Sequence, residues 1–214
     1  MVRTTSDWGG GVDGRPYLAR AFSYLHASAG ELSFLLEDVG PGTHRLSGLS
    51  AGDELKLVGP LGNTFSASSG PVVLVGGGIG VAPIAAFAAS LPESAEVKVV
   101  LGFRDADRSE AAGLFESAFV CTDDGSVGHH GFVTDPLREI LSAAPGTELI
   151  ACGPPAMLEA TRQLAEEFGS ASQLALEAPM ACGYGACYGC VVETVVGYKR
   201  VCVDGPVFAG ADLG

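Results

Sequence analysis

The pattern of hydrophobic and polar positions changes near residue 70 and divides the chain into regions of different predicted structure. Before the change, residues 1–67 contain short alternating runs, LARAFSYL, ELSFLLEDV and DELKLVG, separated by Gly and Pro. Alternation with a period of two is typical of antiparallel strands that bury one face. We therefore expect a β-barrel over residues 1–67, and the Ser-rich stretch Ser66–Gly70 is expected to be a linker.

Beyond this linker, in residues 70–170, continuous apolar runs alternate with amphipathic ones. PVVLVGGGIGVAPIAAFAASL predicts a buried strand, a Gly-rich turn and an Ala-rich helix. Further strands are expected at EVKVVLGFR, FVCTDDG and ELIACGPP, and helices at AAGLFESA, DPLREILSAA and MLEATRQLAEEFG. Strands that alternate with helices are typical of a parallel sheet covered by helices. We therefore expect a Rossmann-like α/β domain, followed by a small third module at residues 173–214.

The third module contains the cysteine spacing that carries the most chemistry. Three cysteines lie within nine residues and a fourth follows a strand-like stretch: they are Cys182, Cys187, Cys190 and Cys202. This C-x4-C-x2-C…C spacing is that of plant-type ferredoxins, in which four thiolates hold a [2Fe–2S] cluster. The small residues between the cysteines let backbone N–H groups approach the sulfurs. We interpret the four cysteines as metal ligands in a one-electron carrier.

A structural zinc site and a disulfide framework are the alternative interpretations of these cysteines. Four-Cys zinc sites usually have two Cys-x-x-Cys pairs, and this module has one, Cys187 and Cys190. Disulfides would suit a small secreted domain, but the N-terminal residues do not resemble a signal peptide. The iron–sulfur interpretation is therefore favoured. Cys121 and Cys152 lie far upstream and are not counted as ligands.

Charge narrows the class of partner. The 214 residues include 25 acidic and 12 basic side chains, for a net charge of −13. This balance argues against nucleic acid or an anionic membrane surface as a partner. No apolar run approaches the length of a membrane span, and we expect a cytoplasmic protein.

The Gly-rich turn GGGIGVAP, at Gly76–Pro83, has two possible roles. Glycines ahead of a helix let a phosphate approach backbone N–H groups. However, the spacing is not G-x-G-x-x-G, and no acidic residue is placed to bind a ribose. Close packing of a helix against a strand would require the same glycines. The residues alone leave both interpretations open.

Several motifs together resemble the ferredoxin–NADP reductase superfamily. GGGIGVAP and the CGP at 152–154 resemble the two turns beside that family's nicotinamide site, and RAFS at 20–23 resembles its flavin signature. GPGT at 40–43 and the run from Gly52 to Phe65 resemble its later flavin elements. The resemblance implies FAD on the barrel and NAD on the α/β domain. The implied FAD residues are Arg20, Ala21, Phe22, Ser23, Leu35, Leu36, Glu37, Gly42 and Thr43; the implied NAD residues are Gly77, Gly78, Gly80, Gly153 and Pro154, with Cys152 as a candidate catalytic residue.

The third module narrows this resemblance. MACGYGACYGC and YKRVCVDGPVF are similar to the C-terminal signature of the electron-transfer subunits of NAD-dependent dihydroorotate dehydrogenases. That family implies an FMN-containing dihydroorotate dehydrogenase catalytic subunit as partner, in a heterotetramer with two copies of each subunit. Electrons would pass through the [2Fe–2S] cluster and FAD to NAD+ in pyrimidine biosynthesis. Alone, such a chain would be an NADH diaphorase at most.

This sequence departs from the family pattern at several points. MVRTT resembles the middle of the barrel's third strand, so we expect a truncated barrel without its first strands. Glu37 stands where the family often has Arg, and Ala21 where Pro is usual. Thr43 could also cap a helix at HRLSGL. Two alternative functions share these motifs: a subunit of an NAD(P)H:ferredoxin or sulfide-type oxidoreductase, and a non-enzymatic iron–sulfur interaction module that binds no flavin.

Overall fold

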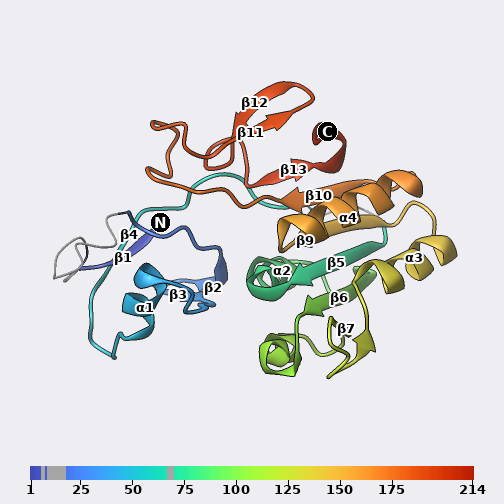
Figure 1. Cartoon of the computed structure of the whole chain (residues 1–214), viewed down its shortest axis with the longest axis horizontal. Coiled ribbons are helices and arrows are strands. Elements are labelled where there is room, and N and C mark those ends of the chain that lie inside the picture. Colours follow the sequence, from blue (N-terminus) through green and yellow to red (C-terminus); the bar gives the residue numbers. More distant parts are fainter. Residues whose placement is uncertain (6–7, 9–17, 67–69) are drawn as a thin grey trace.

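A seven-stranded sheet is the centre of the computed structural model, which describes residues 1–5, 8, 18–66 and 70–214. In spatial order its strands are β13 (Val207–Ala209), β10 (Ser172–Ala175), β9 (Glu148–Cys152), β5 (Val72–Gly77), β6 (Val97–Phe103), β7 (Phe119–Thr122) and β8 (His129–His130). Neighbouring strands are parallel except for β10 and β13. The predicted parallel α/β fold is confirmed (Figure 1).

The central strand β5 is buried on both faces of the sheet, and its successive side chains point to opposite sides. Val73 and Val75 of β5 share a buried cluster with side chains of α3 (Thr134–Ala143) and α4 (Pro155–Glu167). Their neighbours Val72 and Leu74 instead pack with α2 (Val81–Ala88). Helices on both faces therefore explain why β5 is apolar throughout instead of alternating.

One predicted helix differs in type and place. We expected a helix at AAGLFESA, residues 111–118, whereas the chain forms a 3₁₀ helix, η2, at Ala106–Leu114. The side chain of Asp105 accepts a hydrogen bond from the N–H of Arg108 at 3.1 Å, which starts a helical turn there. The apolar pattern alone gave no sign of this earlier start.

The N-terminal region, residues 1–66, contains two small antiparallel sheets among its described residues. Strand β1 (Val2–Thr4) pairs with β4 (Leu55–Leu57), and β2 (Tyr24–Ser28) pairs with β3 (Glu31–Phe34). A short helix, α1 (Pro41–Ser47), lies between β3 and β4 in the sequence. The predicted antiparallel character of the region is confirmed.

The prediction of a strand at LARAFSYL, residues 18–25, is largely wrong. Only a single bridge joins Arg20 to Val2, and the strand begins at Tyr24. The guanidinium of Arg20 donates to the carbonyl of Leu18 at 2.6 Å, so that carbonyl is satisfied locally instead of across a sheet. Alternation in the sequence could not reveal this local bond.

The C-terminal region both completes the large sheet and extends away from it. Strands β10 and β13 belong to the sheet, while β11 (Val191–Thr194) and β12 (Gly197–Arg200) form a separate hairpin. Figure 1 shows this hairpin and the loop before it beyond the β13 edge, with the short helix η3 (Gly210–Asp212) at the chain end. No helix in the described part of the chain is long and apolar enough to cross a membrane.

Candidate functional site

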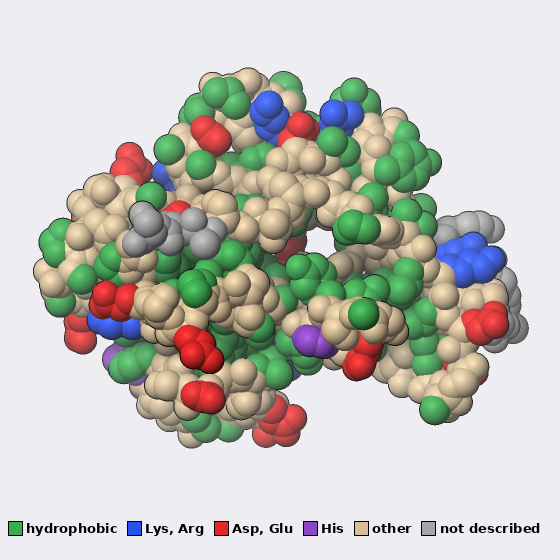
Figure 2. Space-filling view, turned by 180° about the vertical axis from the view of Figure 1, so that it is seen from behind, with side chains coloured by type: hydrophobic (Ala, Val, Ile, Leu, Met, Phe, Trp, Pro, Cys, Tyr) green, Lys and Arg blue, Asp and Glu red, His purple; other side chains and the backbone are tan. Residues whose placement is uncertain are grey.

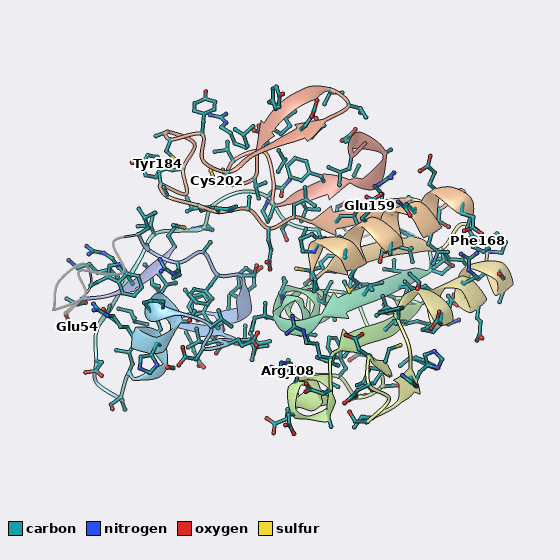
Figure 3. All side chains as sticks on the ribbon, in the orientation of Figure 1. Glu54, Arg108, Glu159, Phe168, Tyr184 and Cys202 are labelled. Atoms are coloured by element: carbon teal, nitrogen blue, oxygen red, sulfur yellow. The ribbon has the colours of Figure 1, made fainter. Side chains whose placement is uncertain are left out.

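The four cysteines of the C-terminal region are brought together as two pairs. Side-chain hydrogen bonds join Cys182 to Cys187, and Cys190 to Cys202. Cys190 and Cys202 are buried, at 3% and 5% exposed, whereas Cys187 is exposed. Figure 3 shows Cys202 and Tyr184, a residue of the intervening loop, at the end of this region that faces the N-terminal region.

Backbone N–H groups of the loop favour thiolates. Hydrogen bonds from the backbone N–H of Tyr184, and then from that of Cys187, lower the pKa of Cys182 to about 6. The N–H of Gly189 lies 3.4 Å from the Sγ of Cys187. Burial raises the pKa of Cys202, and its hydrogen bond with Cys190 adds to the rise. The loop therefore provides N–H donors for anionic sulfur at Cys182 and Cys187, whereas Cys190 and Cys202 form a pair that is largely removed from water.

The paired arrangement of the cysteines fits a two-iron cluster. Among the described residues, no group of three or more His, Cys, Asp or Glu side chains is placed to hold one metal ion. A [2Fe–2S] cluster needs two protein ligands on each of its two irons. Two adjacent thiol pairs meet that need, whereas a zinc ion would require four thiolates around one point.

Arg200 and Asp204 support the cysteine loop. Neither residue was assigned a function from the sequence. The guanidinium of Arg200 donates to the carbonyl of Gly185 at 3.2 Å and lies over the ring of Tyr188, 5.2 Å from its centroid. Tyr188 has a φ of 56°, a left-handed backbone that costs energy for a non-glycine residue. Asp204 accepts from the backbone N–H of Arg200 at 2.8 Å. Their positions, two residues on either side of Cys202, were the available signal.

The residues expected to bind FAD come together at one end of the β2–β3 hairpin. Tyr24 pairs with Phe34, so residues 21–23 and 35–37 leave the hairpin at the same end. The rings of Phe22 and Phe34 pack there with centroids 6.1 Å apart. Ala21 and Ser23 are exposed, and Leu35 and Leu36 are half-buried.

Arg20 and Gly42, from two separate flavin motifs, are in direct contact. A Cβ added to Gly42 would collide with the guanidinium of Arg20, so a larger residue at position 42 would require that side chain to move. Thr43 is the third residue of α1, and its hydroxyl accepts from the N–H groups of Val39 and Gly40, each at 2.9 Å. The capping role considered for Thr43 is therefore present, but Thr43 acts as the third residue after the N-cap Gly40 and not as the N-cap itself.

Glu37 points away from this contact. Its carboxylate lies 3.9 Å from the Nε of Arg108 in η2, which belongs to the α/β domain. The ion pair is exposed on both sides, so its contribution to stability is small. It nevertheless links the N-terminal region to the α/β domain at a position where the resemblance implied a cofactor contact.

The two turns expected to bind NAD pack directly on each other. A Cβ on Gly80 would collide with the carbonyl of Cys152, and one on Gly77 would meet Pro154 and Met157. Close packing, the structural interpretation of these glycines, is therefore confirmed for both. Gly78 differs, because its φ is +53° and nothing lies within 4 Å of a Cβ placed on it. Its backbone is the part of the turn with open space beside it.

Cys152 is placed between these turns but is not an activated thiol. It is 5% exposed, and burial, followed by the charge of Glu177, raises its pKa to about 12. A thiol in this state is protonated and unreactive at neutral pH. Cys121 is fully buried in the core beneath α3, and burial raises its pKa to about 11. Cys121 is therefore a residue of the hydrophobic core.

Comparison with known proteins connects these features. Residues 177–214 match the family described as the iron–sulfur cluster binding domain of dihydroorotate dehydrogenase B. The dihydroorotate dehydrogenase B (NAD(+)) electron transfer subunit of Clostridium acetobutylicum is 37% identical over 94% of this chain and 81% of its own length. The corresponding subunit of Streptococcus pneumoniae is 41% identical over 79% of this chain and 69% of its own length.

Solved structures agree on the fold. A chain from the structure of an NADH-dependent reduced ferredoxin-NADP oxidoreductase, determined in work on flavin-based electron bifurcation, has a TM-score of 0.80 and 32% identity. The match covers 90% of this chain and 73% of that one. The ferredoxin reductase of carbazole 1,9a-dioxygenase shares the fold with a TM-score of 0.61 at 21% identity. The chain thus belongs to the family of dihydroorotate dehydrogenase B (NAD(+)) electron transfer subunits.

Proposed function

We propose that this chain carries electrons from a dihydroorotate-oxidising, FMN-containing catalytic subunit to NAD+, as part of pyrimidine biosynthesis. The observation that carries the proposal is the two thiol pairs in the C-terminal loop of a chain that belongs to this family. The assembly expected is a heterotetramer with two copies of each subunit.

The cluster ligands in this proposal are the four cysteines already described. Cys182 and Cys187 would bind one iron and Cys190 and Cys202 the other, because these are the thiols that already lie in contact. The backbone N–H groups of Tyr184 and Gly189 would stabilise the charge on the sulfurs. Arg200 would hold the loop closed through Gly185.

FAD is proposed to bind the N-terminal region, with its pyrophosphate on Arg20 beside Gly42. Arg20 supplies a fixed cation, and its contact with Gly42 leaves no bulk between the two motifs. Figure 2 shows a hollow where the N-terminal region, the α/β domain and the C-terminal region meet. A flavin ring bound at this hollow would lie between the proposed NAD site on the α/β domain and the cluster on the C-terminal region.

NAD is proposed to bind over Gly78 and the turn at Gly153–Pro154. The open space beside Gly78 supports backbone contact with the nucleotide, while Gly77 and Gly80 keep the two turns packed. Cys152 would contribute a neutral, fixed surface next to the nicotinamide. When bound, nicotinamide exchanges hydride, flavin handles one or two electrons, and the cluster handles one.

An assay of the assembled complex tests the proposal. The purified chain, loaded with FAD and iron, is mixed with an FMN-containing dihydroorotate-oxidising subunit, and NADH formation is followed at 340 nm, the absorbance band of NADH. We expect dihydroorotate-dependent NADH formation from the complex and from neither subunit alone. A loaded chain that neither forms NADH in the complex nor reduces a dye from NADH by itself would contradict the proposal.

One observation favours a second candidate function. The 32% identity and TM-score of 0.80 relate the chain to an NADH-dependent reduced ferredoxin-NADP oxidoreductase as well. A subunit of that kind would work with a larger flavin and iron–sulfur partner and would exchange electrons with ferredoxin. Reduction of ferredoxin, with no response to dihydroorotate in the complex assay, would favour this candidate.

A further inference from the structure

The segment that leaves the N-terminal region, residues 61–66, is hydrogen-bonded to residues 204–207, just beyond Cys202. The side-chain amide of Asn63 donates to the carbonyl of Asp204 at 3.1 Å and to that of Val207 at 2.8 Å. Its Oδ1 accepts from the N–H of Val207 at 2.8 Å, and its own backbone N–H donates to the carbonyl of Gly205 at 2.6 Å. One residue thus makes four hydrogen bonds to a segment more than 140 positions away.

The residue before Asn63 shows how close this approach is. Gly62 has a φ of +74°, and a Cβ on it would collide with the carbonyl of Gly205 and press on the ring of Pro206. Any other residue at position 62 would therefore push the two segments apart. In Figure 1 the same segment, on its way from β4 to β5, runs alongside the loop that precedes β11.

A continuous set of hydrogen bonds leads from Asn63 to the cysteine loop. Asn63 holds the carbonyl of Asp204, whose carboxylate accepts from the backbone N–H of Arg200. Arg200 in turn donates to the carbonyl of Gly185, between Cys182 and Cys187. The approach is also close at Gly183, where an added Cβ would collide with the side chain of Met1 and meet that of Leu61. The N-terminal region is therefore linked to the cysteine loop through Asp204 and Arg200, and it lies against the loop at Gly183.

We propose that Asn63 is a positioning residue that sets the place of the cluster relative to the flavin. The inference rests on the proposed function, since it needs FAD on the N-terminal region and the cluster on the cysteine loop. Electron transfer between two centres falls steeply with their separation, so a small displacement of one region slows it. Asn63 touches neither cofactor in this account and acts through Asp204 and Arg200.

A purely structural role for Asn63 is the competing explanation, and the chain supplies a matched control. The amide of Gln173 in β10 also fastens this segment: its Nε2 donates to the carbonyl of Ser66, and its Oε1 accepts from the N–H of Ser66, both at 2.9 Å. The Gln173 backbone pairs with Ala209 of β13, but its side-chain amide bonds only Ser66 and Glu148 within the described part of the chain, so a side-chain truncation leaves the strand pairing in place. Removing the amide should loosen the linker without moving the cysteine loop.

The test compares Asn63→Ala and Gln173→Ala in the full, cofactor-loaded chain. NADH is mixed rapidly with each variant, and reduction of flavin and cluster is followed separately by absorbance and by electron paramagnetic resonance (EPR) of the reduced cluster. We expect Asn63→Ala to keep the flavin reduction rate and the EPR line shape but to reduce its cluster at least about tenfold more slowly. Gln173→Ala should reduce its cluster at the wild-type rate. Equal cluster rates in wild type and Asn63→Ala, or equal slowing in both variants, would overturn the proposal.

Two further measurements keep the proposal independent of loading and folding. Asn63→Asp keeps the acceptor for the N–H of Val207 but places a carboxylate against the carbonyl oxygens of Asp204 and Val207. We therefore expect cluster reduction to slow at least as much as in Asn63→Ala. Cluster reduction at the wild-type rate in Asn63→Asp would show that the two amide donors of Asn63 have no role. Amide hydrogen exchange is measured in all variants, with faster exchange over residues 182–190 expected only for the Asn63 variants. Unchanged exchange over residues 182–190 in the Asn63 variants would overturn the positioning role, whether or not the wild-type chain binds flavin. A wild-type chain that binds no flavin would instead refute the proposed function.

Discussion

Leu74 and Leu55 are both strand leucines, yet their surroundings differ completely. Leu74 of β5 is fully buried, whereas Leu55 of β4 is 41% exposed. The contrast extends to their regions. Every described member of the large buried clusters lies at Phe65 or later, while the N-terminal region leaves Leu18, Tyr24, Leu32, Val39, Leu55, Leu57, Val58 and Leu61 exposed.

The difference separates a region that is stabilised by its own core from one that depends on attachments. The α/β domain buries apolar side chains on both faces of its sheet, which is the main source of folding free energy. The N-terminal region is instead attached through Asn63, through the contact of β2 with α2, and through the Glu37–Arg108 pair. We expect bound cofactors to contribute much of the remaining stability of the N-terminal and C-terminal regions.

The largest expected effect comes from removing a cluster ligand. Cys190→Ser should abolish iron and acid-labile sulfide binding, because one iron would lose a buried thiolate. The α/β domain should still unfold at the same urea concentration, since its core contains no cluster ligand. Cys121→Ala is the matched control: it should keep its iron while weakening the core. Full iron content in Cys190→Ser would contradict the ligand assignment.

Truncating the two leucines tests the comparison itself. Leu74→Ala should lower the free energy of unfolding by about 2–5 kcal/mol, because it leaves a cavity in the packed core. Leu55→Ala should change it by less than about 0.5 kcal/mol, as for an ordinary surface substitution. Urea unfolding followed by circular dichroism measures both in the cofactor-free chain. Similar losses in the two variants would show that the N-terminal region has a core of its own.

Flavin binding provides a smaller, more specific effect. Arg20→Ala should weaken FAD binding by about tenfold or more, as expected when a charge-assisted hydrogen bond to phosphate is lost. Lys56→Ala, an exposed cation on β4, serves as the control and should leave FAD affinity unchanged. Isothermal titration with FAD measures both. Equal affinities in wild type and Arg20→Ala would place the flavin pyrophosphate elsewhere.

The smallest expected effect concerns the charged surface of the α/β domain. The guanidinium of Arg162 lowers the pKa of Glu159 below its ordinary value of 4.5, chiefly through hydrogen bonds at 2.9 Å. A lowered pKa means that the carboxylate contributes stability above pH 4.5 and that this contribution is lost as the pH falls through the folded-state value.

Glu159→Gln should therefore be less stable than wild type at pH 7, by less than about 1 kcal/mol because the pair is near the surface. The difference between the two proteins should shrink as the pH falls below 4.5. Urea midpoints measured from pH 7 to pH 3 test this. A difference that grows toward low pH would contradict the sign of the shift.

The sequence predicted the α/β domain well for a physical reason. Runs such as PVVLV are buried on both faces, so their burial is written locally as continuous apolar residues. Strand β5, helix α3 and helix α4 lie where the pattern indicated, and Gly169 follows α4 with a φ of +61°, as expected beyond a helix end.

What the sequence did not predict depends on contacts between distant residues. The four bonds of Asn63 reach Asp204, Gly205 and Val207, and no local pattern around GPLGNTF records them. The glycines of GGGIGVAP illustrate a different limit. Gly77 and Gly80 are needed for close packing, whereas Gly78 has open space beside it. These two roles can be told apart only once the position of the turn at Cys152 is known. The cysteine spacing was recognisable because all four positions lie within one short segment.

The central claim is that this chain holds a flavin and a two-iron cluster within one electron-transfer unit. The most direct test is a visible absorption spectrum of the purified chain, combined with flavin, iron, sulfide and zinc assays on the same sample. The account predicts one FAD, two irons and two sulfides per chain, with flavin and cluster bands that both bleach on addition of NADH. A colourless chain that contains zinc and neither flavin nor iron would contradict it.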